Sequence, residues 1–167
     1  KTKIKPLIPI PITYGSGSTI DFISVGASAT PHTKGAWVQL IASTSGNHTC
    51  LDLGVADSFM NGFDTSMLMD IGFGAPGSEV VVVQNLATGY RASIVSAGAL
   101  DTYTIPINIP NGTRIAARVQ STIGSHTVNI MPRVLDLPPT VTVPSAIDTI
   151  GANTATSRGV TLTPTTV

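Results

Sequence analysis

The sequence has little charge and a single cysteine, and both shortages exclude classes of function. Charged residues make up 11% of the 167 residues, against about 25% in an ordinary soluble domain. The formal net charge is zero, so there is no general electrostatic case for binding nucleic acid or a membrane surface. So little charge indicates instead that a partner covers part of the surface. Cys50 stands alone, which excludes an intrachain disulfide and predicts a small buried apolar side chain.

Long apolar runs and catalytic motifs are also missing. No run approaches the roughly 20 apolar residues that span a bilayer, and the start lacks the pattern of a signal peptide. The sequence contains no Walker loop, dinucleotide fingerprint or nucleophile elbow. We therefore expect no enzyme activity, no cofactor and no membrane partner.

Alternation of apolar and polar residues is the strongest positive signal, and it is clearest from Asp101 to Arg133. In its first run, isoleucines alternate with prolines and Asn108, which is the period of a half-buried strand. Two prolines in such a run predict an edge strand. Turns at 110–112 and 124–126 separate two further runs, so this stretch predicts three antiparallel strands in a β-meander. Such a meander needs a second sheet to cover its apolar face.

The chain between Ala36 and Arg133 contains more short runs of this kind. Residues 36–44 predict a central strand, and residues 50–55 predict its hairpin partner. Residues 67–73 form another run. Val80–Val83 predicts a buried strand that a turn at 85–89 closes, and 90–95 predicts one more strand.

About nine strands result, with turn signals every 8–12 residues or so and no helical period, which is typical of an all-β sandwich or barrel. We predict a single jelly-roll-like antiparallel β-sandwich. Its core is expected to contain Val81, Val83, Ile115, Val119 and Ile130.

Composition divides the chain into three ranges. Residues 1–35 predict an extended N-terminal arm and linker, residues 36–136 the sandwich domain, and residues 137–167 an extended C-terminal arm. Prolines at 6, 9 and 11 forbid a helix in the first arm. Extended apolar segments can add a strand to a neighbour's open sheet edge, so we expect both arms to contact neighbouring subunits. The predicted subunit-contact residues are Ile4, Leu7, Ile8, Ile10, Ile12, Val141, Val143 and Ile147, with Ile150 in the same segment.

The histidines and acids that could bind a metal or act in catalysis do not have the sequence spacing of a known motif. The histidines His32, His48 and His126 are far apart in the sequence, and none has the short spacing of metal ligands. The acids Asp52, Asp57, Asp64 and Asp70 lie around one predicted loop, but they are too sparse for a calcium-binding loop. We expect a solvated loop and no metal, with a loose calcium site and paired carboxylates for glycoside chemistry as the alternatives.

Three strand phrases carry a resemblance: GAWVQLIAS from Gly35, DIG at Asp70 followed by GSEV at Gly77, and IAARVQS from Ile115. Together they resemble β-sandwich (jelly-roll) structural proteins of tailed-bacteriophage virions, over residues 35–136. The resemblance implies a non-enzymatic assembly role, as a capsid decoration or cement protein or as a tail, fibre or adaptor component. It also implies other virion proteins as partners, a homo-oligomer that is often a trimer, and a location in the particle after assembly in the host cytoplasm. No catalytic, cofactor or metal residues come with it.

A second class of function is a carbohydrate- or receptor-binding β-sandwich module. Such modules offer exposed aromatic rings on which sugars stack. Only Tyr14, Tyr90, Tyr103 and Trp37 could serve here, and we expect Trp37 in the core. A hydrolase on a β-sandwich is a third alternative, which no motif favours.

Overall fold

The computed structural model describes residues 12–13, 22–57, 65–91, 101–138 and 140–160, which form strands and no helix. Among these residues, no helix has the length and apolar character needed to cross a membrane. The strands are β1 (Ile12–Thr13), β2 (Ile23–Gly26), β3 (Val38–Ile41), β4 (His48–Asp57), β5 (Thr65–Phe73), β6 (Val80–Arg91), β7 (Asp101–Ile109), β8 (Ile115–Ser121), β9 (Thr127–Leu135), β10 (Ile147–Asp148), β11 (Ala152–Asn153) and β12 (Arg158–Gly159).

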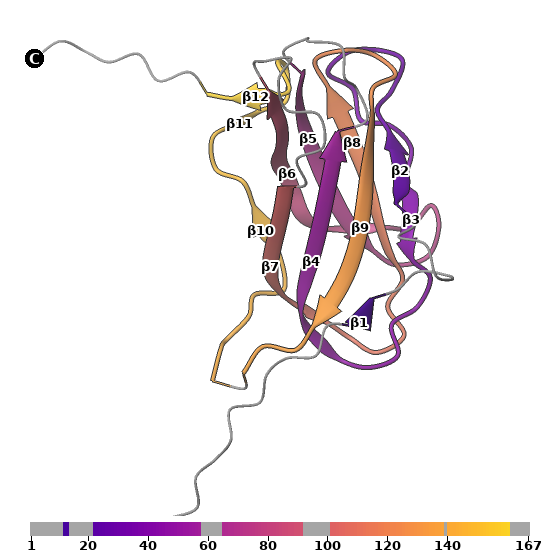
Figure 1. The fold of residues 1–167 in the computed structure, drawn as a ribbon, viewed down its shortest axis with the longest axis vertical. Helices are drawn as coiled ribbons and strands as arrows, with labels where there is room; N and C mark the ends of the chain where they lie inside the picture. Colours follow the sequence, from indigo (N-terminus) through magenta and orange to yellow (C-terminus); the bar gives the residue numbers. More distant parts are fainter. Residues whose placement is uncertain (1–11, 14–21, 58–64, 92–100, 139, 161–167) are drawn as a thin grey trace, which may run out of the picture.

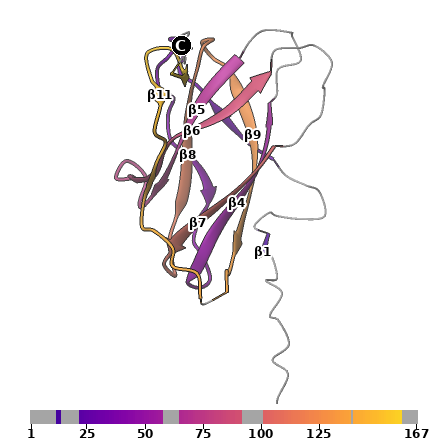
Figure 2. The same cartoon turned by 90° about the vertical axis from the view of Figure 1, so that its left-hand side faces the viewer.

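Two sheets pack against each other as a β-sandwich (Figure 1). The first sheet has the order β1-β9-β4-β7, and β2 also pairs with β9. The second sheet has the order β10-β6-β5-β8-β3, and β11 with β12 forms a separate two-stranded ribbon. The two layers are seen from the side in Figure 2. These pairings confirm the predicted all-β sandwich, but they do not confirm a jelly roll specifically.

The three strands predicted between Asp101 and Arg133 exist, but they do not form a meander. Strands β7 and β9 lie in the first sheet on either side of β4, whereas β8 lies in the second sheet between β5 and β3. Five residues connect each pair of consecutive strands, at 110–114 and 122–126. A connection of this length can cross the roughly 10 Å between packed sheets. Each strand of this stretch therefore lies in the opposite sheet from the one before it.

Strands β3 and β4 also lie in different sheets, so the predicted hairpin between them is wrong. The predicted central position of β3 is wrong as well, because β3 is the edge strand of the second sheet and pairs only with β8 there. Trp37, just before β3, was expected in the core, but it is half-buried outside the core and lies against Gly72 of β5. A Cβ atom at Gly72 would come within 2.8 Å of the indole ring, so only glycine lets the ring lie this close to the sheet.

Strand β6 is one long strand where the sequence predicted two strands and a turn. Asn85 lies in the middle of it with φ = 54°, a left-handed conformation that asparagine tolerates better than most residues. The register with β5 shifts nearby, at Ile71. The predicted turn at 85–89 is therefore a local irregularity within a continuous strand, and residues 92–95 lie outside the described residues. Over Ala36 to Arg133 the described residues form seven strands, β3 to β9, in place of about nine.

The prediction of an edge strand from two prolines is confirmed. Strand β7 is the last strand of the first sheet and pairs only with β4 there. Its burial alternates strictly from Ile105 to Ile109, with the three isoleucines buried and Pro106 and Asn108 exposed. A proline has no backbone N–H to donate to a neighbouring strand, and it is therefore favoured in an edge strand, where one side has no neighbour in the sheet.

The core lies between the two sheets and contains four of the five predicted residues. Val83, Ile115, Val119 and Ile130 are each at most 1% exposed. Val81 is half-buried, because the register shift between Ile71 and Gly72 turns Val82 and Val83 inward instead.

Replacing Ile115 by alanine is expected to lower the free energy of unfolding by about 2–5 kcal/mol, since the side chain is fully buried and leaves a cavity. Denaturant unfolding measures this loss. Val80→Ala is the control, because Val80 is 67% exposed and its truncation should change stability by less than about 0.5 kcal/mol. An equally small loss for Ile115→Ala would contradict the assignment of the core.

The sandwich begins before residue 36, which was its predicted boundary. Strand β2 pairs with β9 from Ile23 to Gly26. The loop after it is also held to the body, since the backbone N–H of Ala27 donates to His126 and that of Gly35 donates to Val119, at 2.7 and 2.8 Å. The predicted arm and linker therefore includes a strand and a loop of the domain.

Candidate functional site

The described end of the N-terminal arm is strand β1, which lies at the edge of the first sheet. Ile12 and Thr13 pair antiparallel with Val134 and Arg133 of β9. Ile12 and Thr13 thus add a strand to an open sheet edge of their own chain. The other predicted contact residues of this arm, Ile4, Leu7, Ile8 and Ile10, lie outside the described residues.

The C-terminal segment runs along one open side of the sandwich, where β6 and β7 face each other across the two sheets (Figure 1). At the first sheet, the N–H of Asn108 in β7 donates to the carbonyl oxygen of Pro144, at 3.1 Å. At the second sheet, Ile147 and Asp148 pair in parallel with Val83 and Gln84 of β6. The segment therefore bridges the edges of both sheets.

Ile147 packs, half-buried, against the core of its own chain. It was predicted as a subunit contact because the sequence shows an apolar residue on an extended segment, but not that the nearest open edge belongs to the same molecule. Val141 is 43% exposed and Val143 is half-buried, so their role as subunit contacts stays a prediction.

The ribbon of β11 and β12 is anchored to the outer face of the second sheet by polar side chains. Gln120 of β8, itself 2% exposed, donates from Nε2 to the carbonyl oxygen of Thr154 at 2.7 Å and to Oγ of Ser157 at 3.0 Å. Nδ1 of His32 lies 3.1 Å from the same Oγ. Ser157 is completely buried. These contacts fix the ribbon to the body.

The anchored ribbon carries two exposed apolar side chains, Ile150 and Val160, here called the C-terminal apolar pair. Their relative exposures are 99% and 58%. The N–H of Val160 donates to the carbonyl oxygen of Gly151 at 2.8 Å, so the backbone of Val160 lies beside the residue that follows Ile150. Ile150 contributes almost no burial to its own fold, which leaves its side chain available to a partner.

Asp70 is the centre of a buried charged cluster on the outer face of the second sheet. Its carboxylate accepts hydrogen bonds from Nζ of Lys34 at 2.8 Å, Nε of Arg118 at 2.9 Å and the backbone N–H of Asn85 at 2.9 Å. Burial lowers the pKa of Lys34, although the bond and the charge of Asp70 oppose that effect. Arg118 also lies over the ring of Trp37, 4.6 Å from its centroid, in a cation–π contact. The cluster holds the loop before β3 against the sheet.

Asp52 forms a second polar cluster, on the first sheet, with an ion pair to Arg133 and a hydrogen bond of 2.9 Å from Thr104. The predicted acidic loop from Asp52 to Asp70 therefore places its two ends in different sheets, each with its own cationic partners. Asp64 and the side chain of Asp57 lie outside the described residues. Within the described ranges, no group of three or more histidine, cysteine, aspartate or glutamate residues could hold a metal ion.

Chelating divalent ions with EDTA is expected to leave the melting temperature unchanged, because Asp52 and Asp70 already have cationic side chains as partners. A thermal melt with EDTA, and a second with added calcium chloride, measures this. A structural calcium ion would stabilise the folded state by mass action. A drop of several degrees on chelation would therefore contradict the expectation.

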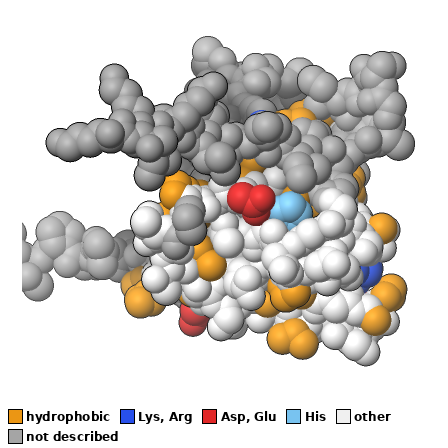
Figure 3. All heavy atoms as spheres, turned by 90° about the horizontal axis from the view of Figure 1, so that it is seen from below, with side chains coloured by type: hydrophobic (Ala, Val, Ile, Leu, Met, Phe, Trp, Pro, Cys, Tyr) orange, Lys and Arg blue, Asp and Glu red, His pale blue; other side chains and the backbone are white. Residues whose placement is uncertain are grey.

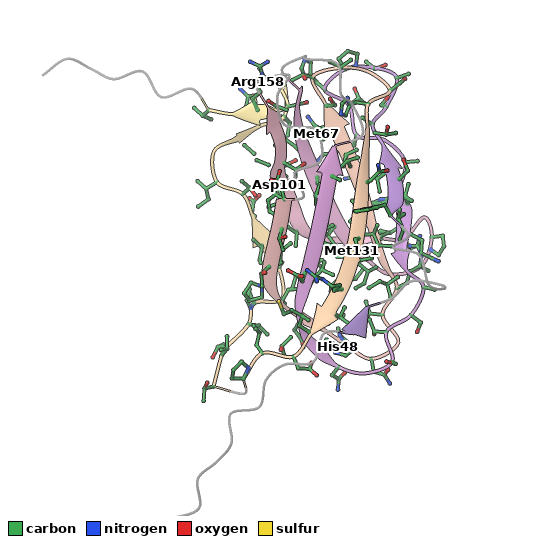
Figure 4. All side chains as sticks on the ribbon, viewed as in Figure 1. His48, Met67, Asp101, Met131 and Arg158 are labelled. Atoms are coloured by element: carbon green, nitrogen blue, oxygen red, sulfur yellow. The ribbon has the colours of Figure 1, made fainter. Side chains whose placement is uncertain are left out.

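The three histidines lie in different parts of the fold. His32 bonds to Ser157, whereas Nδ1 of His48 lies 3.2 Å from Asp136 at the other end of the sandwich (Figure 4), and His126 is buried. The structure therefore does not bring the three rings together.

The prediction of a buried Cys50 is confirmed. Burial, and then the charge of Asp52, raise the pKa of its thiol, which keeps it unreactive.

Comparison with known proteins identifies no family for this chain. No family model and no curated protein matches the sequence. A chain from a structure of infectious bursal disease virus, Gx strain, is similar to 84% of this chain, with a TM-score of 0.37 and 12% sequence identity. The present chain spans 38% of the length of that chain. So low a TM-score establishes neither a common fold nor a common role, and the description as a β-sandwich rests on the strand pairing itself.

Proposed function

We propose that this chain is a non-enzymatic structural protein of a virion, a capsid decoration or cement protein or a tail or fibre component. In this role it binds neighbouring copies of itself and other virion proteins through its terminal segments. The observation that carries the assembly role is the C-terminal apolar pair, Ile150 and Val160, exposed on an anchored ribbon.

The anchoring of the ribbon matters because binding costs less when the contacting segment is already ordered. Gln120 and Ser157 hold the ribbon by buried hydrogen bonds, so the apolar pair is presented on a fixed support. Burying an isoleucine and a valine against a partner would contribute about 1.5–3 kcal/mol for each side chain. The pair can therefore contribute a substantial part of the energy of a subunit contact.

The low charge of the chain also supports partnering. Charged side chains are sparse on the described part of the surface that is seen from below (Figure 3), in agreement with the 11% of charged residues in the sequence. Cores of interfaces are depleted in charged residues relative to the rest of a protein surface. The virion assignment is supported by the resemblance of three strand phrases to tailed-phage structural proteins and by the lack of any catalytic motif in the sequence.

The test is the molar mass of the purified full chain, measured by light scattering after size exclusion over a range of concentrations. We expect an oligomer, and we expect the double variant Ile150→Ser, Val160→Ser to dissociate at concentrations at least about 10-fold higher than the unaltered chain does. Measured at a concentration where both proteins are monomeric, its melting temperature should not fall, because both side chains are exposed.

Val80→Ser is the matched control, since it also removes an exposed apolar side chain, at 67% exposure, from a different strand. It should leave the mass unchanged. A monomeric full chain, or equal losses for the control and the double variant, would contradict the proposed role of the C-terminal apolar pair.

A further inference from the structure

A cavity of about 580 Å³ opens at one end of the sandwich, beside the C-terminal ribbon. Its wall includes Ser66 and Met67 of β5, Thr88 of β6, Asp101 and Tyr103 of β7, and Arg158 of β12. Figure 4 shows Met67, Asp101 and Arg158 at the same end of the molecule, away from His48. Both sheets and the ribbon therefore contribute side chains to one hollow.

Two hydroxyl groups in this wall are buried without a partner. Ser66 is 6% exposed and Thr88 is 4% exposed, and neither side-chain oxygen has a hydrogen-bond partner among the described residues. A buried polar atom without a partner costs about 1–3 kcal/mol, and such atoms are rare in folded proteins. Both residues line the cavity but their oxygens are closed off from solvent, so a polar ligand in the cavity would satisfy them once the two side chains rotate toward it.

The other polar groups of the wall are complementary in type. Asp101 offers carboxylate acceptors, and Arg158 offers guanidinium donors. Tyr103 is half-buried and presents an aromatic ring with a hydroxyl. Burial, and then the charge of Asp101, raise the pKa of Tyr103, so its hydroxyl stays protonated and can donate. The cavity thus combines donors, acceptors and one ring face without a net charge.

We propose that this cavity binds a neutral pyranose unit of a glycan. Each sugar hydroxyl both donates and accepts a hydrogen bond, which suits the unpaired oxygens of Ser66 and Thr88, while a C–H face of the ring can pack on Tyr103. An apolar ligand would leave both hydroxyls unpaired, and the wall, with Asp101 and Arg158 together, has no net positive charge to favour an anionic one. The cavity volume lies in the range of about 300–1,000 Å³ that small-molecule sites occupy.

The test uses the full chain labelled with ¹³C at its methionine methyl groups. Met67 lies in the cavity wall and Met131 lies in β9 of the first sheet, so the two methyl signals are a reporter and an internal control. The probes are glucose, galactose, rhamnose and N-acetylglucosamine at millimolar concentration, with N-acetylneuraminic acid as an anionic comparison. At least one neutral sugar should shift the Met67 signal saturably and leave that of Met131 in place.

Thr88→Val and Ser66→Ala remove the unpaired hydroxyls and should each weaken binding of that sugar about 10-fold. Thr142→Val, on an exposed threonine, should not weaken it. Because these hydroxyls have no described partner, Thr88→Val should not lower the melting temperature. The proposal is overturned if no neutral sugar moves the Met67 signal more than that of Met131, or if only N-acetylneuraminic acid does. Unchanged binding by Thr88→Val, or a lower melting temperature for it, would overturn the proposal too.

Discussion

Replacing Asp70 by alanine is expected to lower the free energy of unfolding by about 3–5 kcal/mol, since removing one partner of a buried ion pair leaves the other charges without compensation. Asp70 is 2% exposed and binds Lys34, Arg118 and the N–H of Asn85. Without it, two cations and a backbone donor on the outer face of the second sheet lose their acceptor. Burial already lowers the pKa of Lys34, and the variant removes the group that opposes this shift.

The matched control for this prediction is Asp136→Ala. The carboxylate of Asp136 also has a partner, Nδ1 of His48, but its side chain is 62% exposed, and an exposed contact of this kind contributes at most about 1 kcal/mol. Asp70→Asn should fall between the two, because its side-chain oxygen can still accept from Asn85 while the charge is lost. Urea unfolding with a constant m value measures all three variants. A loss for Asp70→Ala no larger than that for Asp136→Ala would show that the cluster does not hold the fold.

The partners of Asp70 explain why sequence analysis did not identify this cluster. Lys34 lies 36 residues before it and Arg118 lies 48 residues after it, and no local pattern joins them. The sequence placed Asp70 with other acids around a loop, although it lies inside the apolar run from Met67 to Phe73. A single acid in a buried strand requires a cationic partner, and this was the available signal.

Strand existence was predictable because the period of two residues is a local property. The alternation of Ile105, Ile107 and Ile109 with prolines predicted both the strand β7 and its place at a sheet edge. The sheet to which each strand belongs was not predictable, because pairing depends on residues far apart in the chain. For this reason we expected β3 to pair with β4, and β8 to pair with β7 and β9. In the structure β3 and β8 pair with each other.

The two ends of the chain show the same limit. Composition indicated extended segments at both ends of the chain, but it left Ile23–Gly26 outside the sandwich and could not say which open edge each terminus covers. Strand β10 pairs with β6 of its own chain, and the C-terminal segment closes the sandwich there. The sequence predicted that this segment contacts a neighbouring subunit, but part of it contacts its own chain instead. Ile150 remains exposed.

Deleting residues 1–11 is expected to leave a folded sandwich and to abolish its assembly. All described strands begin at Ile12 or later, so the deletion removes none of them and the circular dichroism spectrum should stay the same. The melting temperature should also stay the same when both proteins are compared as monomers. The deleted residues carry apolar side chains between three prolines, which keep a free arm extended and reduce the entropy lost on docking. Light scattering should find a monomer where the full chain forms an oligomer.

Two full-length variants separate the apolar from the charged contribution of this arm. Serine at Ile4, Leu7, Ile8 and Ile10 retains the charges, and glutamine at Lys1, Lys3 and Lys5 retains the apolar side chains. If apolar burial dominates, the serine variant should be monomeric and the glutamine variant should still assemble. Salt screens the lysine charges, so assembly of the unaltered chain should weaken at high salt, whereas assembly of the glutamine variant should not depend on salt. Removal of residues 137–167 should instead lower stability, because Ile147 packs against the core. If the chain without residues 1–11 keeps the molar mass of the full chain, the N-terminal arm is not an assembly device.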